Sequence, residues 1–164
     1  MEEEVVRTLK QLHDNHPHSE NPSMEKYFNC FTTNARFLGT QSGDNWSMPE
    51  YKRYLVPMYN SGQRIIPVKP LEESRKINLC GDFFASFDEV LLGYDEKGAL
   101  RSELRGSGSM VREKEGGGEG RGLTWKIALY LLSVPIPNDA AISVGSHLTQ
   151  PHPFPDPSRP PPPP

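Results

Sequence analysis

The feature that most constrains this chain is a long region in which apolar and polar side chains alternate. Beyond residue 63 the period of the pattern changes to two, and five successive segments predict strands. This period puts neighbouring side chains on opposite faces, as in a β-strand. The five segments are RIIPVKPL (64–71), SRKINLC (74–80), FFASFDEVLLGY (83–94), LRSELRGSGSMVREK (100–114) and LTWKIALYLLSV (123–134).

Helical patterns come before these strands. Residues 1–15 carry apolar side chains at helical spacing, and residues 23–31 predict a second, short helix. The clearest helix follows Ser47, because Glu50 stands three residues later and completes a capping box. Pro57 should bend or end this helix. Helices followed by a run of strands predict an α+β fold, with helices packed on one face of a bent sheet.

Composition excludes several classes of protein. The 164 residues suffice for one domain, and a net charge of −3 with scattered Lys and Arg argues against binding nucleic acid. No apolar run is long enough to span a membrane, and the acidic start MEEEVV does not suit a secretory signal. Cys30 and Cys80 are expected to be reduced thiols packed in the interior. These features predict a cytoplasmic protein.

The chain divides into three parts by composition. Residues 1–22 are expected to form an N-terminal helix and linker, residues 23–142 the folded domain, and residues 143–164 a proline-rich disordered tail. The tail ends in SRPPPPP, which favours polyproline II. It is either an idle segment or a ligand for a proline-reading domain.

One strand carries two adjacent carboxylates among apolar residues. In FFASFDEVLL (83–92), alternation sends Asp88 to one face and Glu89 to the other. A carboxylate in such surroundings needs a cation or a raised pKa, and Arg105 on the next predicted strand is the expected cation. Two interpretations stay open: a buried ion pair that fixes strand register, or an acid that lines a cavity and is tuned by Arg105.

Several motifs occur in the order found in one protein family. They are RFLGT (36–40), NWSMPEYKRYLVP (45–57), FDEVLLGY (87–94), RGSGSMVRE (105–113) and TWKIALYLLSVPIPND (124–139). Together they resemble a SnoaL-like domain of the nuclear transport factor 2-like superfamily, and the resemblance covers about Met24 to Asp139.

The resemblance implies a cone-shaped, strongly curved antiparallel sheet packed on N-terminal helices, the cystatin-like α+β barrel, with a cavity between sheet and helices. It also implies a homodimer formed through the convex sheet face. The superfamily includes ketosteroid isomerase, scytalone dehydratase, limonene epoxide hydrolase and polyketide cyclases, as well as non-catalytic members. Function therefore depends on the cavity residues.

Carried over to this chain, the family's acids and arginine fall on Asp88, Glu89 and Arg105, which would be the catalytic residues. Tyr54 would supply a hydrogen-bond donor. The residues expected to line the cavity are Trp46, Tyr54, Phe87, Trp125, Leu129 and Leu131.

Two of these positions depart from the family pattern. Leu129 and Leu131 stand where the family usually has polar residues, and alternation with Trp125 predicts that they face the cavity. A chain of this kind catalyses cofactor-free proton transfer (isomerisation, cyclisation or dehydration) on a small hydrophobic molecule, or it is a non-catalytic ligand-binding or dimerisation module. Both alternatives remain open.

The histidine-rich segment HDNHPHS (13–19) does not predict a metal site. Pro17 interrupts helical geometry, and no Cys or carboxylate set completes the ligands around His13, His16 and His18. Neither a metal nor a cofactor is expected, and no histidine falls within the predicted sheet.

Overall fold

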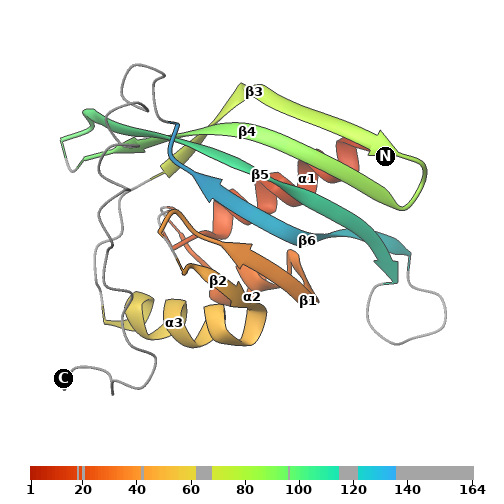
Figure 1. The fold of residues 1–164 in the computed structure, drawn as a ribbon, viewed down its shortest axis with the longest axis horizontal. Helices are drawn as coiled ribbons and strands as arrows, with labels where there is room; N and C mark the ends of the chain where they lie inside the picture. The colour runs from red at the N-terminus through yellow and green to blue at the C-terminus, as the bar shows by residue number, and fades with distance from the viewer. Residues whose placement is uncertain are drawn as a thin grey trace, which may run out of the picture. The chain divides into compact units, whose positions relative to one another are not determined.

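The structure is a computed structural model that describes residues 1–17, 19, 21–41, 43–61, 68–95, 97–114 and 122–135. Residues Met1–Val134 form one compact unit. The predicted proline-rich tail (143–164) lies outside the described residues. The elements, in chain order, are α1 (Glu2–Asn15), α2 (Met24–Phe28), β1 (Phe31–Leu38), β2 (Asn45–Ser47), α3 (Met48–Asn60), β3 (Val68–Cys80), β4 (Phe84–Tyr94), β5 (Leu100–Lys114) and β6 (Leu123–Ser133) (Figure 1).

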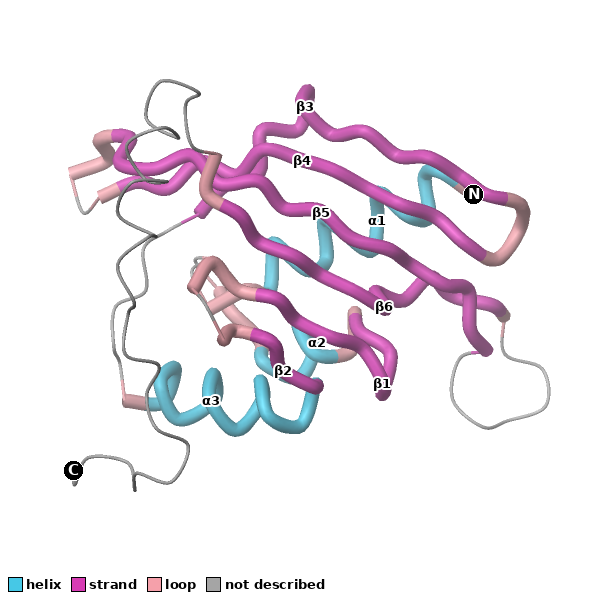
Figure 2. The backbone as a smooth tube through the Cα atoms, in the orientation of Figure 1, coloured by secondary structure: helices cyan, strands magenta, loops and turns pink. Residues whose placement is uncertain are grey.

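The six strands form a single curved sheet that does not close on itself (Figures 1 and 2). The strand order is β2-β1-β6-β5-β4-β3. The helices lie on its concave side, so the predicted α+β class, with a curved sheet on N-terminal helices, is confirmed. One pair, β1 with β6, is parallel, whereas the other neighbours are antiparallel. Sequence periodicity does not reveal this pairing, because the two strands are far apart along the chain.

Local signals predicted the helices well. The capping box forms: Glu50 Oε2 accepts hydrogen bonds from the Ser47 backbone nitrogen at 2.8 Å and from its hydroxyl at 2.6 Å. Pro57 does not end α3, which continues to Asn60. The predicted second helix stops earlier than expected, at Phe28, because the chain enters β1 three residues later.

The described part of the first predicted strand (68–71) and the whole second predicted strand (74–80) belong to one element, while residues 64–67 lie outside the described residues. β3 runs without interruption to Cys80, and its pairing with β4 shifts register between Leu71 and Lys76. This irregularity separates the two patterns in the sequence, because side chains on either side of a bulge no longer follow a single alternation.

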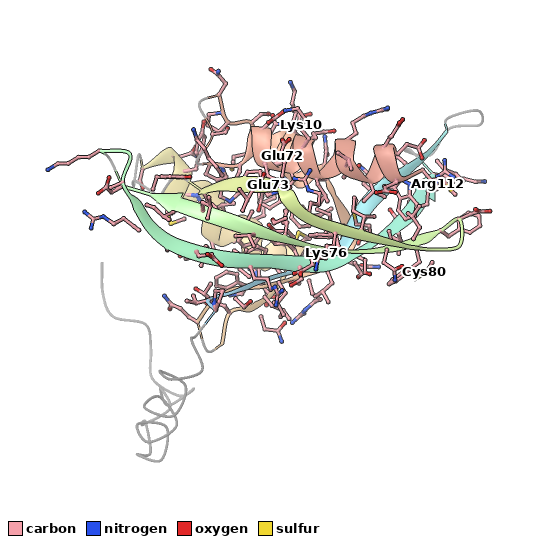
Figure 3. All side chains as sticks on the ribbon, turned by 90° about the horizontal axis from the view of Figure 1, so that it is seen from above. Lys10, Glu72, Glu73, Lys76, Cys80 and Arg112 are labelled. Carbon is pink, nitrogen blue, oxygen red and sulfur yellow. The ribbon has the colours of Figure 1, made fainter. Side chains whose placement is uncertain are left out.

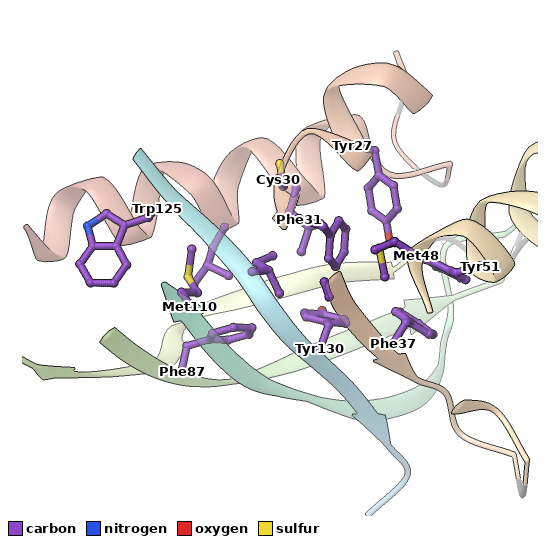
Figure 4. Close-up of a cluster of buried hydrophobic side chains, with 14 of the residues drawn as sticks. Tyr27, Cys30, Phe31, Phe37, Met48, Tyr51, Phe87, Met110, Trp125 and Tyr130 are labelled. Carbon is purple, nitrogen blue, oxygen red and sulfur yellow. Dashed lines mark hydrogen bonds between the residues drawn. The ribbon is translucent and has the colours of Figure 1, made fainter. Parts of the chain in front are cut away.

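The core lies between the helices and the concave face of the sheet (Figure 4). Helix α1 contributes Val5, Leu9 and Leu12, so residues 1–15 are part of the folded unit. Cys30 is buried as expected, but Cys80 is exposed at the end of β3. Among the described residues, no helix is both long and apolar enough to cross a lipid bilayer.

Candidate functional site

The two adjacent acids of β4 point to opposite faces of the sheet, as alternation predicted. Glu89 shares the inner face with the buried Phe87 and Leu91, and only 1% of Glu89 is exposed. Asp88 lies on the outer face, with 35% of its side chain exposed. Only Glu89 is therefore placed near the interior of the domain.

Glu89 is held between Arg75 of β3 and His13 of α1. Its Oε2 accepts from Arg75 Nε at 2.9 Å and lies 2.9 Å from Nη2, while Oε1 lies 2.6 Å from His13 Nε2. Burial alone would raise the pKa of Glu89, but the His13 hydrogen bond and the charges of His13 and Arg75 outweigh it. The pKa of this carboxyl is therefore lowered below its usual range. Glu89 is ionised and fully paired.

Sequence reasoning missed both partners of Glu89, although a signal existed for each. His13 follows Leu9 by four residues and so shares the buried stripe of α1. Arg75 stands two residues before Ile77, which packs against the core, so strand alternation puts Arg75 on the inner face. In each case a charged or polar side chain occupies one position in a row of otherwise apolar, inward-facing residues.

Arg105, the cation expected for the carboxylates, is on the outer face. Its Nε lies 3.1 Å from Asp88 Oδ1, and its side chain is 59% exposed. The expected Arg105–carboxylate pair therefore forms with Asp88, but it is not buried and does not approach Glu89. Arg105 pairs with Val90 across the β4–β5 ladder, which puts both on the face opposite Glu89.

A cavity of about 550 Å³ opens on the concave side of the sheet, near α3 and the C-terminal end of α1. It is mainly apolar and takes residues from every helix and every strand. Its lining is Leu12, His13, His16, Tyr27, Phe37, Gly39, Thr40, Gln41, Asp44, Trp46, Tyr51, Tyr54, Leu55, Met58, Val68, Leu91, Ser102, Leu104, Tyr130 and Leu132.

Aromatic rings form one side of this cavity as a nearly parallel stack. The Phe37 and Tyr51 ring centroids are 4.0 Å apart with 9° between planes, and Trp46 lies 5.6 Å from Tyr51 at 10°. Tyr54 continues the series 4.9 Å from Trp46 at 28°. Because Tyr54 is 52% exposed, it stands at the mouth of the cavity. Stacked rings of this kind form a flat apolar wall.

The structure places two of the six predicted lining residues in the cavity wall, two in the core and two on the outer face of the sheet. Trp46 and Tyr54 line the cavity. Phe87 and Trp125 are buried core residues, and Trp125 lies at the end of the core away from Tyr51 (Figure 4). The described cavity wall includes neither of them.

Leu129 and Leu131 do not line the cavity; Tyr130 and Leu132 take their place. The prediction assumed unbroken alternation from Trp125, but the β5–β6 register shifts between Ser109 and Met110. This irregularity moves the inward phase of β6 by one residue, which sends the two leucines to the outer face.

The glycines of RGSGSM make room for side chains on the inner face. A Cβ on Gly108 would lie 2.1 Å from the Leu129 carbonyl oxygen and 2.9 Å from the Phe87 ring. A Cβ on Gly106 would lie 2.9 Å from the Tyr130 hydroxyl. The space that these glycines leave on the inner face is therefore occupied by Phe87 and Tyr130.

The buried tyrosines of the cavity are hydrogen-bonding groups and not bases. The Tyr27 and Tyr51 hydroxyls are 3.2 Å apart, and burial raises the pKa of both phenols well above the usual value. Burial, with the nearby charge of Glu89, does the same to the pKa of Tyr130. Within the described ranges, no three His, Cys, Asp or Glu side chains converge as metal ligands.

Comparisons with known proteins agree on the fold. No protein-family model matches the chain, and no curated protein matches its sequence. Solved structures do match, including a domain of unknown function with a cystatin-like fold from Nostoc punctiforme. Its TM-score is 0.64 at 10% identity, over 90% of this chain and 85% of that one.

Two further structures carry the same fold. A nuclear transport factor 2-like protein of unknown function from Pseudomonas putida has a TM-score of 0.56 at 9% identity, over 84% of this chain and 89% of that one. A candidate ketosteroid isomerase from Shewanella frigidimarina has a TM-score of 0.52 at 15% identity, over 79% and 94%. At such identities the likeness establishes architecture and not activity. The curved sheet, the concave cavity and these likenesses together show that the chain has the cystatin-like, nuclear transport factor 2-like α+β fold.

Proposed function

We propose that this domain binds a small, flat and largely apolar molecule in the cavity on its concave face. The observation that carries this proposal is the stack of Phe37, Tyr51, Trp46 and Tyr54 along one wall. A planar ligand would extend that stack, and a volume of about 550 Å³ falls within the usual range for small-molecule sites. The family resemblance supports the same interpretation.

Binding is favoured over chemistry performed by the carboxylates. Glu89 is already ionised and saturated by Arg75 and His13, so it has no proton to give and little tendency to take one. Asp88 and Arg105 lie on the opposite face of the sheet from the cavity, and the proposal does not use them.

Binding can be tested with 2-naphthol, a flat molecule with one hydroxyl, by isothermal titration calorimetry. We expect saturable binding that Tyr54→Ala weakens about tenfold, because a stacking surface at the mouth is lost. Tyr59→Ala is the matched control, since Tyr59 is on the same helix but outside the cavity lining. No binding, or equal losses in both variants, would contradict the proposal.

Cofactor-free proton transfer is the second candidate, and the pairing of His13 with Glu89 favours it. A carboxylate at 2.6 Å orients the imidazole, while the ring lines the cavity. His13 would take a proton from an activated carbon of the ligand and return one from solvent. One structural neighbour is described as a candidate ketosteroid isomerase.

This chemistry can be tested without knowing the natural substrate. In D₂O, the wild type should speed the exchange of the acidic CH₂ protons of 2-tetralone, measured by proton NMR, and His13→Gln should abolish the increase. Asp88→Asn is the control, because its carboxylate lies on the outer face. If exchange with the wild type equals exchange in buffer, the domain is a binding module only.

Three further expectations enter here as proposals. We propose a homodimer formed through the outer sheet face, where Leu129 and Leu131 are only half-buried in the single chain. Sedimentation should then show a dimer that Leu131→Glu dissociates.

We also propose a cytoplasmic location, supported by two free thiols. A proline-reading partner for residues 143–164 stays a proposal based on composition.

A further inference from the structure

A second hollow of about 610 Å³ lies between α1 and β3, beside the first cavity. Its character differs, because most of its lining is polar or charged. The lining residues are Lys10, His13, Asp14, Ser19, Asn21, Val68, Lys69, Pro70, Glu72 and Arg75. In Figure 3, Lys10 and Glu72 lie on the side of the sheet that carries α1.

The two hollows adjoin. His13 and Val68 line both of them, so one molecule can pass along these two residues from the aromatic wall into the polar hollow. The aromatic cavity accounts for a flat apolar body. The proposed function gives no role to the polar hollow. The residues that line this hollow therefore indicate which further chemical group the ligand carries.

Arg75 is the strongest ligand-binding group in the polar hollow. Its side chain is only 8% exposed, so little water competes for it. Nε and Nη2 are both directed at Glu89 Oε2, whereas Nη1 has no hydrogen-bond partner among the described residues. A guanidinium with one unused nitrogen in a sheltered hollow is a donor for an anionic oxygen.

The acids of the hollow do not cancel this preference. Asp14 is paired with Lys10 at 3.0 Å, so their charges offset each other. Glu72 and Lys69 are both exposed and of opposite sign. Arg75 is therefore the one lining cation of the described hollow that is strongly buried and still has an unused donor.

We propose that the ligand is amphipathic: a flat apolar body in the aromatic cavity, joined by a short chain to a carboxylate that binds Arg75 in the polar hollow. This inference rests on the proposed binding function and specifies the class of ligand. His13 would lie beside the junction between body and chain.

The test compares three ligands that share one apolar body. Naphthylbutanoate, naphthylbutanol and naphthylbutylamine differ only in their anionic, neutral and cationic heads. Titration calorimetry on the wild type should give the butanoate about tenfold tighter binding than the alcohol, the usual gain from one charge-assisted hydrogen bond. The amine should bind no better than the alcohol.

Arg75→Lys separates ligand recognition from folding, because lysine keeps a cation beside Glu89 and loses Nη1. It should remove the preference for the butanoate and leave binding of the alcohol unchanged. Arg112→Lys is the matched control: Arg112 also joins the sheet to α1, through Glu4 at 3.3 Å, but it lies outside both hollows.

Each outcome decides between the hypotheses. If none of the three ligands binds, the proposed function fails, and the inference fails with it. If all three bind alike, or the amine binds best, the domain binds flat molecules but the inference is wrong. If Arg75→Lys weakens alcohol and butanoate equally, Arg75 supports the structure and does not recognise the head. Wild-type selectivity decides the matter even if the variant does not fold.

Discussion

Asp88 and Glu89 are neighbours in the chain, yet the two faces of β4 give them opposite environments. Glu89 is 1% exposed and held by Arg75 and His13. Asp88 meets Arg105 at 3.1 Å in a pair whose two side chains are 35% and 59% exposed. The same functional group is thus a fixed, desolvated charge on one face and a solvated surface charge on the other.

This contrast shows that the contribution of an ion pair to stability depends on how far its charges are exposed to water. Water screens the outer pair, which limits its contribution to stability to about 1 kcal/mol or less. The inner cluster has lost its water, so removal of one partner leaves a charge with no compensation.

Removal of the inner carboxylate should have the largest effect. Glu89→Ala should lower the free energy of unfolding by about 3–5 kcal/mol, because Arg75 would be left buried without a counterion. Asp88→Ala should cost less than about 1 kcal/mol. Urea unfolding followed by tryptophan fluorescence measures both, and equal losses would show that the two faces do not differ.

Crowding of the inner face should come next. Gly108→Ala would bring a methyl group against the Leu129 carbonyl oxygen and the Phe87 ring, and should cost about 2–3 kcal/mol. Ser107→Ala is the neighbouring change on the outer face and should cost less than about 1 kcal/mol. The same unfolding experiment applies. A tolerated Gly108→Ala would mean that β5 and β6 can separate without loss.

Low pH should weaken the contacts that Glu89 makes with Arg75 and His13. Glu89 has a lowered pKa in the folded state, so the unfolded chain binds its proton more readily. Its stabilisation is therefore present above its ordinary pKa of about 4.5 and is lost as pH falls through the folded value. Between about pH 5 and pH 3, wild-type stability should fall more steeply than that of Glu89→Gln.

Among the described residues, Asp95 and Glu50 also have carboxyls with lowered pKa values, so the Glu89→Gln curve should still slope. Comparison of the two curves isolates the contribution of Glu89. Parallel curves for wild type and Glu89→Gln would contradict a lowered pKa at Glu89.

The outer pair should give the smallest effect. Arg105→Gln should change the free energy of unfolding by about 0.5 kcal/mol at low salt, and by less at about 1 M salt. Chemical unfolding at two ionic strengths measures this change. A loss of several kcal/mol that salt does not reduce would mean that Arg105 is buried in an assembly of chains.

Much of the fold could be predicted locally. The alternation that separates Asp88 from Glu89 depends only on the pleat of a strand, and the capping box of Ser47 and Glu50 depends on residues three apart. The order of helices and strands indicated the α+β class. The family resemblance supplied the expected curvature of the sheet, which the structure confirms.

The candidate site was harder to predict from the sequence, because it depends on residues that come into contact only after folding. Alternation placed Leu129 and Leu131 in the cavity, but a register shift in β6 gives those places to Tyr130 and Leu132. Arg105 was the nearest cation along the predicted sheet. The side chains that reach Glu89, Arg75 and His13, come from β3 and α1.

Local sequence patterns sufficed to place Asp88 and Glu89 on opposite faces of one strand and to locate the start of α3, since the covalent geometry of a few consecutive residues decides both. Only the tertiary structure decided which cation neutralises Glu89 and which rings form the cavity wall. Those contacts join segments as distant as His13 and Glu89. They depend on sheet curvature, bulges and helix docking, which no short stretch of sequence encodes.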